Sequence, residues 1–124
     1  MPTLLVVEPD PNNRRYVRVN LEARGYETTL AATPAEALEL VRQTPPSALV
    51  LNVYPYEEAA LSLLDTLSHD PRLSRLPVIV VSGAAADRQR FTLRYDNVFG
   101  VLVKPFRADL LVRTVNAAIS SDGR

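Results

Sequence analysis

Four short, continuous apolar runs constrain the fold of this chain more than any other feature. They are rich in valine and leucine and do not alternate with polar residues, which is typical of strands covered on both faces in a parallel sheet. The runs are Leu4–Val7, Ala48–Leu51, Val78–Val81 and Val101–Val103. A weaker fifth run, Glu27–Leu30, predicts a more exposed strand. The sequence therefore predicts five strands.

Helical patterns separate and follow these runs. Gly25 predicts the end of the first helix, and the capping box Thr33–Glu36 predicts the start of the second. The predicted helices are Asn13–Arg24, Pro34–Gln43, Glu57–His69, Ala84–Asp96 and Ala108–Ser120. The chain is thus expected to repeat a strand followed by a helix five times.

This alternation predicts an α/β fold with right-handed crossovers and helices on both faces of the sheet. Five such units fit the flavodoxin-like, doubly wound (βα)5 fold, a parallel five-stranded sheet of strand order 2-1-3-4-5. We expect residues 1–119 to form a single domain, and residues 120–124 to be a frayed tail or the start of a linker. Ligands of such folds bind beyond the carboxyl ends of the strands, beside strands one and three.

Composition narrows the classes of function. Fourteen Lys and Arg residues balance fourteen Asp and Glu residues, so we expect no nucleic-acid binding by this domain, and its arginines are interpreted as solvated helix faces. No apolar stretch approaches the roughly 20 residues that span a bilayer, and no signal peptide is evident, so we expect a cytoplasmic protein without membrane contact. One histidine and no cysteine offer little for catalysis, and we expect no enzyme activity.

Polar residues stand at the carboxyl ends of the predicted strands. Glu8 and Asp10 follow the first strand and Asn52 ends the third. Ser82 ends the fourth strand, and Lys104, the one lysine of the chain, follows the fifth. Because parallel strands end at a common edge, these side chains are expected to meet on one rim of the sheet.

With these residues in place, the chain resembles the response-regulator receiver domains of two-component signalling over essentially its whole length. Each motif that carries the resemblance is weak alone, but all occur in order on five strand–helix units. The motifs are Val6–Pro11 with Arg14, Leu49–Asn52 with Pro55, Pro77–Gly83 and Lys104–Phe106.

The resemblance implies a specific chemistry at the rim. In the family, two acids after strand one bind Mg²⁺, and an aspartate after strand three accepts a phosphoryl group. A hydroxyl and a lysine contact that phosphoryl, and here they correspond to Ser82 and Lys104. Carboxylate attack forms an acyl phosphate, while the metal and the lysine stabilise its charge. The family also implies a cis peptide bond before Pro105.

The chain departs from the family pattern at three positions. Asn52 occupies the phosphoacceptor position, and an amide cannot form a stable acyl phosphate. Pro9 occupies the place of the second metal-binding acid, so we expect no cofactor, with Mg²⁺ at Glu8 and Asp10 weak at most. Val101 replaces the aromatic residue that acts as a rotating switch in many members. We expect Lys104 to pair with Glu8 instead.

The resemblance therefore implies a degenerate receiver domain of a phosphorelay that acts by protein–protein contact. Its partner would be a histidine kinase, an output domain or another signalling protein. The family's usual partner surface comprises the fourth helix, fifth strand and fifth helix, through which a homodimer is also an option. Candidate residues of this surface are Arg90, Phe91, Arg94 and Tyr95.

Alternatives stay open at this point. The old phosphate pocket offers a binding site for a nucleotide, flavin or anion, although the acids and prolines of residues 8–13 disfavour phosphate. Asn52 and Lys104 have purely structural interpretations as a satisfied amide and an ion-pair member, and Ser82 has one as a turn residue. Tyr54 and Tyr56 either fill the space of the metal and phosphate or form a binding surface.

Overall fold

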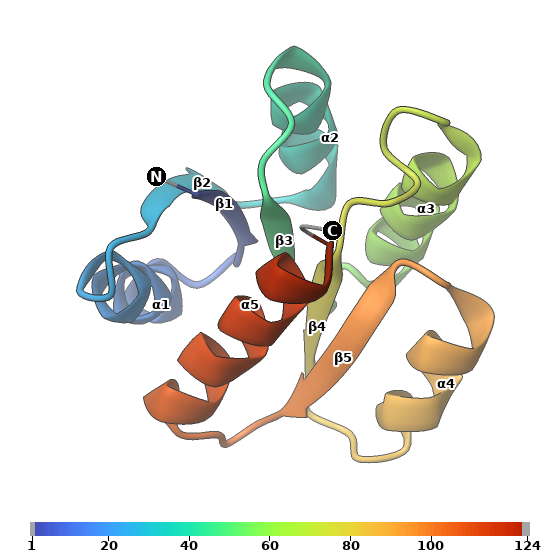
Figure 1. Ribbon diagram of the computed structural model, residues 1–124. Helices are drawn as coiled ribbons and strands as arrows, with labels where there is room; N and C mark the ends of the chain where they lie inside the picture. Colours follow the sequence, from blue (N-terminus) through green and yellow to red (C-terminus); the bar gives the residue numbers. More distant parts are fainter. Residues whose placement is uncertain (1, 123–124) are drawn as a thin grey trace.

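The computed structural model describes residues 2–122, which form one parallel five-stranded sheet with helices on both faces (Figure 1). The strand order is β2-β1-β3-β4-β5, which confirms the predicted topology. The strands are β1 (Thr3–Val7), β2 (Glu27–Ala31), β3 (Ala48–Asn52), β4 (Val78–Ser82) and β5 (Val98–Val103). The helices are α1 (Pro11–Glu22), α2 (Pro34–Gln43), α3 (Glu57–His69), α4 (Asp87–Arg94) and α5 (Ala108–Asp122).

Two hydrophobic layers hold the helices to the sheet. One layer joins α1 and α5 to one face, with Leu21 and Leu111 fully buried against Val50. The other joins α2, α3 and α4 to the opposite face, with Leu64 and Phe91 fully buried. Figure 1 shows α1 and α5 together on one side of the sheet and α3 and α4 on the other. Every residue of β3 and β4 is buried, as expected for central strands of a parallel sheet.

Some boundaries differ from the predicted ones. Helix α1 begins at Pro11 because the Asp10 side chain caps it, accepting a hydrogen bond from the Asn12 backbone N–H at 2.8 Å. Strand β5 begins at Val98, before the predicted apolar run. Helix α5 continues through Asp122, beyond the end predicted at Ser120, and residues 123–124 of the predicted tail lie outside the described residues.

The predicted helix signals at Gly25 and Thr33 are confirmed. The Thr33 hydroxyl accepts from the Glu36 backbone N–H at 3.2 Å, while the Glu36 carboxylate accepts from the Ala32 N–H at 2.8 Å. Gly25 has a φ of 94°, a backbone conformation that side chains with a Cβ adopt only with strain. Gly25 thus lets the chain turn from α1 into β2.

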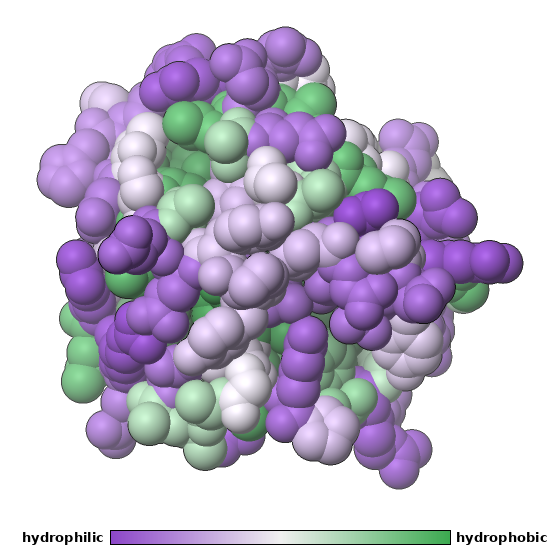
Figure 2. Space-filling model, turned by 180° about the vertical axis from the view of Figure 1, so that it is seen from behind, coloured by the Kyte–Doolittle hydropathy of each residue, from purple (hydrophilic) through white to green (hydrophobic). Residues whose placement is uncertain are grey.

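No helix within residues 2–122 is both long and apolar enough to cross a membrane. Figure 2 shows the side opposite to the view of Figure 1, where hydrophilic residues dominate and hydrophobic ones form separate small areas.

We predict that Gly25→Ala lowers the free energy of unfolding by about 1 kcal/mol, because the added Cβ is strained at positive φ. No atom lies within 4 Å of that Cβ, so the loss comes from the backbone alone. Gly83→Ala is the matched control, since Gly83 also has open space but no positive φ. Urea unfolding of both variants measures the difference, and equal stabilities would contradict this explanation.

Candidate functional site

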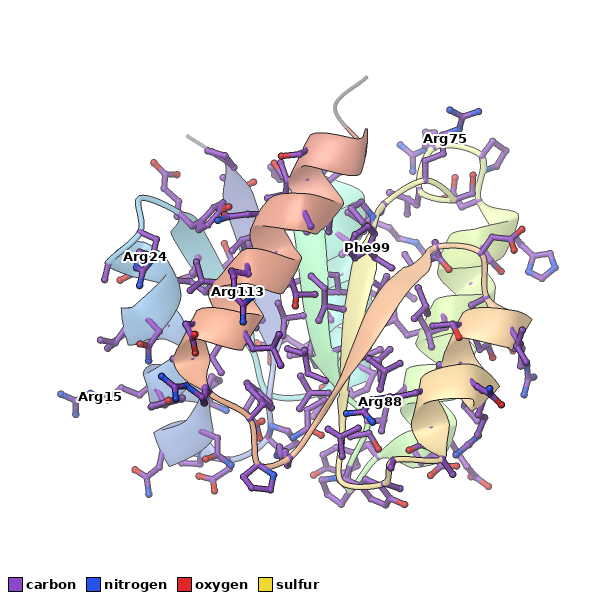
Figure 3. The ribbon with its side chains drawn as sticks, turned by 60° about the horizontal axis from the view of Figure 1, so that its bottom comes forward. Arg15, Arg24, Arg75, Arg88, Phe99 and Arg113 are labelled. Carbon is purple, nitrogen blue, oxygen red and sulfur yellow. The ribbon has the colours of Figure 1, made fainter. Side chains whose placement is uncertain are left out.

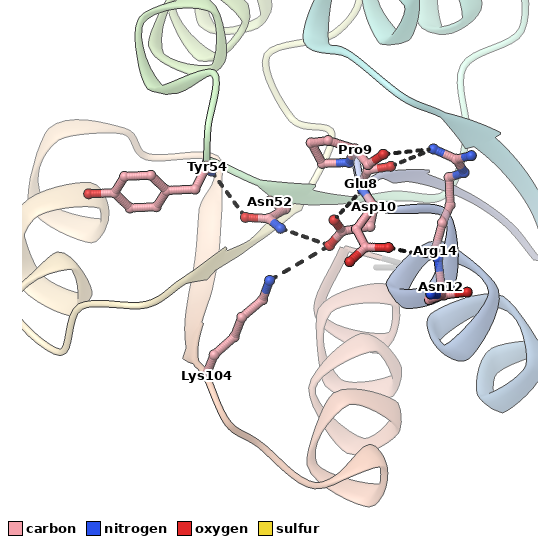
Figure 4. A network of polar contacts seen from close by, with 8 residues as sticks. All are labelled: Glu8, Pro9, Asp10, Asn12, Arg14, Asn52, Tyr54 and Lys104. Carbon is pink, nitrogen blue, oxygen red and sulfur yellow. Dashed lines mark hydrogen bonds and ion pairs between the residues drawn. The ribbon is translucent and has the colours of Figure 1, made fainter.

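Glu8, Asn52 and Lys104 meet at the carboxyl ends of β1, β3 and β5 (Figure 4). Asn52 is the last residue of β3, Glu8 follows β1 and Lys104 follows β5. Strands β1 and β3 are neighbours in the sheet, and the chain reverses direction of winding there, so the group lies at the switch point expected for ligand sites of this fold.

The Glu8 carboxylate is the centre of this group and is only 5% exposed. Its Oε1 accepts a hydrogen bond from Asn52 Nδ2 at 2.7 Å, and its Oε2 accepts from the Asp10 backbone N–H at 3.0 Å. The Lys104 Nζ lies 3.8 Å from Oε1, which confirms the predicted ion pair. A buried carboxylate is costly unless it is paired and hydrogen-bonded, and here both conditions are met within the chain.

The Asn52 amide uses both of its ends. Its nitrogen donates to Glu8, while its Oδ1 accepts from the Tyr54 backbone N–H at 3.1 Å. The side chain is 6% exposed, so these bonds satisfy a buried polar group. An aspartate in this position would instead set a second carboxylate against Glu8. A neutral amide therefore fits beside Glu8, whose negative charge is already paired with Lys104.

Asp10 does not join the Glu8 carboxylate in a metal site. Its side chain is exposed and caps α1, and Arg14 Nη1 donates to the carbonyl oxygens of Glu8 and Pro9 at 2.8 and 3.4 Å. Pro9 offers no side-chain ligand atom. Across the described part of the chain, no three His, Cys, Asp or Glu residues are grouped to hold a metal ion. These residues do not fit the octahedral, oxygen-rich coordination that Mg²⁺ requires.

The Ser82 side chain hydrogen-bonds at the start of α4 and not with the Glu8 group. Its Oγ donates to the Asp87 carboxylate and accepts from the Ala84 backbone N–H at 3.0 Å. Arg90 Nη1 contacts Asp87 Oδ1 at 3.0 Å, and the same guanidinium pairs with Glu57 at the start of α3. We call Ser82, Asp87, Arg90 and Glu57 the Asp87 cluster.

The Asp87 cluster was not predicted from the sequence. The only available signal was the three-residue spacing of Asp87 and Arg90, which places the two on one face of a helix. The Glu57 carboxylate, assisted by Asp87, raises the pKa of Arg90 above its ordinary value. Asp87 is 4% exposed, so its charge depends on Arg90 and on the Ser82 hydroxyl.

The loop residues around the site differ in part from prediction. The Lys104–Pro105 peptide bond is cis, as predicted, and the Tyr54–Pro55 bond is also cis, which was not predicted. Tyr54 and Tyr56 are 49% and 45% exposed, so the interpretation that they fill the space of metal and phosphate is wrong. Val101 is half-buried against the layer that includes α4.

The predicted partner surface needs a correction. Phe91 and Tyr95 are 0% and 3% exposed, because they face the sheet and pack in its hydrophobic layer. Burial raises the pKa of the Tyr95 phenol. Arg90 and Arg94 remain on the surface, and each guanidinium lies over the ring of the following residue, at 4.9 and 5.2 Å from the ring centre.

The arginines do not gather on one face in the view of Figure 3. Arg15 lies on α1, Arg24 lies in the turn between α1 and β2, and Arg113 lies on α5. Arg75 lies in the loop between α3 and β4, and Arg88 lies on α4. Their spread agrees with the interpretation of solvated helix faces.

The fold and the strand-end residues define the class of protein: a doubly wound α/β domain with a polar group at its switch point. Residues 4–116 match the model of the response regulator receiver domain family. The chain belongs to this family and is a receiver domain of two-component signalling.

Individual relatives agree with this assignment. The chain is 26% identical to the polar-differentiation response regulator DivK of Brucella ovis over 115 residues, covering 93% of this chain and 94% of that protein. Among solved structures, a sensor protein from Polaromonas sp. JS666 superposes with a TM-score of 0.85 at 28% identity, and the match covers 98% of both chains. The receiver domain of the Francisella response regulator 1452 gives 0.84 at 25% identity, again covering 98% of both chains.

We predict that Asn52→Asp lowers the free energy of unfolding by about 2 kcal/mol at pH 7, since it buries a second carboxylate beside Glu8 and removes a donor. The pKa of the introduced carboxyl is raised in the folded state, so the loss shrinks as the pH falls through that pKa and vanishes below about pH 4. Chemical unfolding at several pH values measures this.

Asn116→Asp is the control for this change. It is the same substitution at an exposed position of α5, where Asn116 Oδ1 accepts from the Tyr26 hydroxyl and an aspartate keeps an acceptor for that bond. Its effect should stay within about 0.5 kcal/mol at every pH. A pH-independent loss in Asn52→Asp would show that like-charge repulsion at Glu8 is not its cause.

We also predict that Arg90→Met lowers the free energy of unfolding by about 2 kcal/mol, because the buried Asp87 loses its cation. The double variant Asp87→Asn, Arg90→Met should lose less than Arg90→Met alone, since no unpaired charge remains. Arg94→Met is the control, as its 4.0 Å pair with Asp65 is exposed on both sides and worth little. Thermal unfolding of the three variants is the measurement, and a loss in the double variant as large as that of Arg90→Met, or larger, would contradict the coupling.

Proposed function

We propose that this receiver domain does not accept a phosphoryl group at the usual position and signals by protein–protein contact. The observation that carries the proposal is the hydrogen bond from Asn52 to Glu8 at 2.7 Å. The bonded amide stands at the tip of β3, which by resemblance to the family would be the position of the reactive aspartate. The domain would therefore hold one state constitutively or respond to a signal other than phosphate.

The chemistry of the amide supports this proposal. A carboxylate oxygen attacks phosphorus as an anion, whereas the amide oxygen is neutral and the amide nitrogen is delocalised. The Asn52 oxygen also accepts from the Tyr54 N–H, which holds it in place. Mg²⁺ would have to displace Asn52 and Lys104 from Glu8, with no second acid at Pro9, so its binding should be weak.

The Asp87 cluster supports a fixed state of the domain. A receiver that switches needs its hydroxyl after β4 free to turn toward the phosphoryl group. Here the Ser82 hydroxyl bonds to Asp87, which Arg90 ties to α3 through Glu57. Breaking these contacts would expose a buried carboxylate, so α4 is held close to α3.

The proposed partner is a protein such as a histidine kinase, an output domain or another signalling protein. Exposed apolar side chains occur on α4, β5 and α5, where Leu93, Phe99 and Leu110 are 82%, 40% and 39% exposed. Apolar side chains of this kind favour protein contacts. They replace Phe91 and Tyr95 as the apolar candidates on this surface, which would serve a partner or a second copy of the chain.

Incubation with acetyl phosphate and Mg²⁺, followed by intact-mass measurement, tests the proposal. We predict no hydroxylamine-labile phosphoryl adduct on the natural chain. The double variant Pro9→Asp, Asn52→Asp restores both missing acids and serves as the positive control, with a Mg²⁺-dependent adduct expected. A stoichiometric, hydroxylamine-labile adduct on the natural chain would contradict the proposal, whatever the variant does.

A further inference from the structure

A cavity of about 270 Å³ opens beside the Glu8 group, between α1 and the loop that follows β5. Its floor is apolar and is formed by Val6, Val50 and Val81, which lie on three adjacent strands and are at most 4% exposed. Its walls include Val17 from α1. Valines at these strand ends are short, and they leave room at the top of the hydrophobic layer under α1 and α5.

Two aromatic rings and a polar rim complete the cavity. Tyr16, half exposed on α1, and Phe106, after the cis Lys104–Pro105 bond, both line it. The rim carries Glu8, Asn52 and Lys104 from the strand ends. A small pocket with an apolar body and a few convergent polar groups is the usual form of a small-molecule site.

The rim has more donors than acceptors to offer. Both oxygens of Glu8 already accept hydrogen bonds, one from Asn52 and one from the Asp10 backbone N–H. Lys104 Nζ has three N–H groups, and its ion-pair distance of 3.8 Å to Glu8 exceeds a hydrogen bond. Asn52 Nδ2 has a second N–H beyond the one it donates to Glu8. The ligand that complements this rim is an acceptor with negative charge.

We propose that the cavity binds a small aromatic carboxylate of one or two rings. The rings would lie on the three valines between Tyr16 and Phe106, and the carboxylate would accept from Lys104. A volume of about 270 Å³ is below the range of drug-sized sites, which favours so small a ligand. A cationic ligand is disfavoured because both Glu8 oxygens already accept hydrogen bonds, whereas Lys104 Nζ, 3.8 Å from Glu8, still has N–H groups to donate.

This inference deepens the proposed function. The role of the bound acid as an input signal rests on that function, whereas its binding does not. A receiver that cannot be phosphorylated needs another signal, and this cavity shares Glu8, Asn52 and Lys104 with the old phosphoryl site. A bound acid would draw Lys104 away from Glu8 and link α1 to the loop before α5. Binding of the acid is independent of phosphorylation, so either idea can fail without the other.

Methyl-detected NMR titration of the full chain tests the proposal, with phenylacetate and 1-naphthoate as probes. We expect saturable shifts at the methyl groups of Val6, Val17, Val50 and Val81 for at least one acid. Its neutral primary amide, phenylacetamide or 1-naphthamide, should bind about tenfold more weakly, because it lacks the charge that Lys104 meets.

Two variants distinguish the contact between Lys104 and the carboxylate from a general effect of removing a positive charge. Lys104→Met should weaken binding of the acid about tenfold and leave the amide unchanged. Arg107→Met removes a cation three residues further along the chain, outside the cavity lining, and should change neither affinity.

Three outcomes would overturn the proposal. The first is the absence of saturable shifts at these methyl groups for both acids up to about 10 mM. The second is equal binding of acid and amide, and the third is an equal loss in both variants. Because Lys104→Met also removes the cation beside the buried Glu8, Lys104→Arg is measured with it; Lys104→Arg keeps the charge and should keep a preference for the acid over the amide.

Discussion

The compensation of one buried carboxylate is the interaction on which the site depends. Glu8 stands at the end of β1 with almost no exposure, so its charge must be met by the chain itself or by a bound cation. The Asn52 amide, the Asp10 backbone N–H and the Lys104 ammonium meet it together. The charge of Glu8 is thus met within the chain, and both of its oxygens already accept hydrogen bonds.

The Asp87 cluster also compensates a buried carboxylate within the chain. Ser82 and Asp87 bond to each other, and Arg90 connects them to Glu57 on α3. Ser82 at the end of β4 thus bonds to Asp87, while Lys104 after β5 pairs with Glu8, so the two side chains share no partner. The domain keeps the receiver scaffold, while Ser82 and Lys104 each have partners within the protein.

The sequence predicted the fold well because continuous apolar runs and helix signals are local and strong. The Lys104–Glu8 pair was predictable too, since strand ends in this topology converge and the chain has one lysine. The burial of Phe91 and Tyr95 was missed because the rotation of α4 is set by packing, which a short arginine-rich helix does not reveal. The role of Asp87 was missed because its partners Ser82 and Glu57 come from two other elements.

Titration of the natural chain with Mg²⁺, followed by the NMR signals of the Asn52 side-chain amide and the Asp10 backbone amide, tests the central claim most directly. Both groups donate to Glu8, so a metal ion that engages this carboxylate must shift them. The account predicts no saturable change of either signal up to about 10 mM Mg²⁺. Saturable shifts of both signals within this range would contradict it, since they would show that Glu8 remains available to a metal.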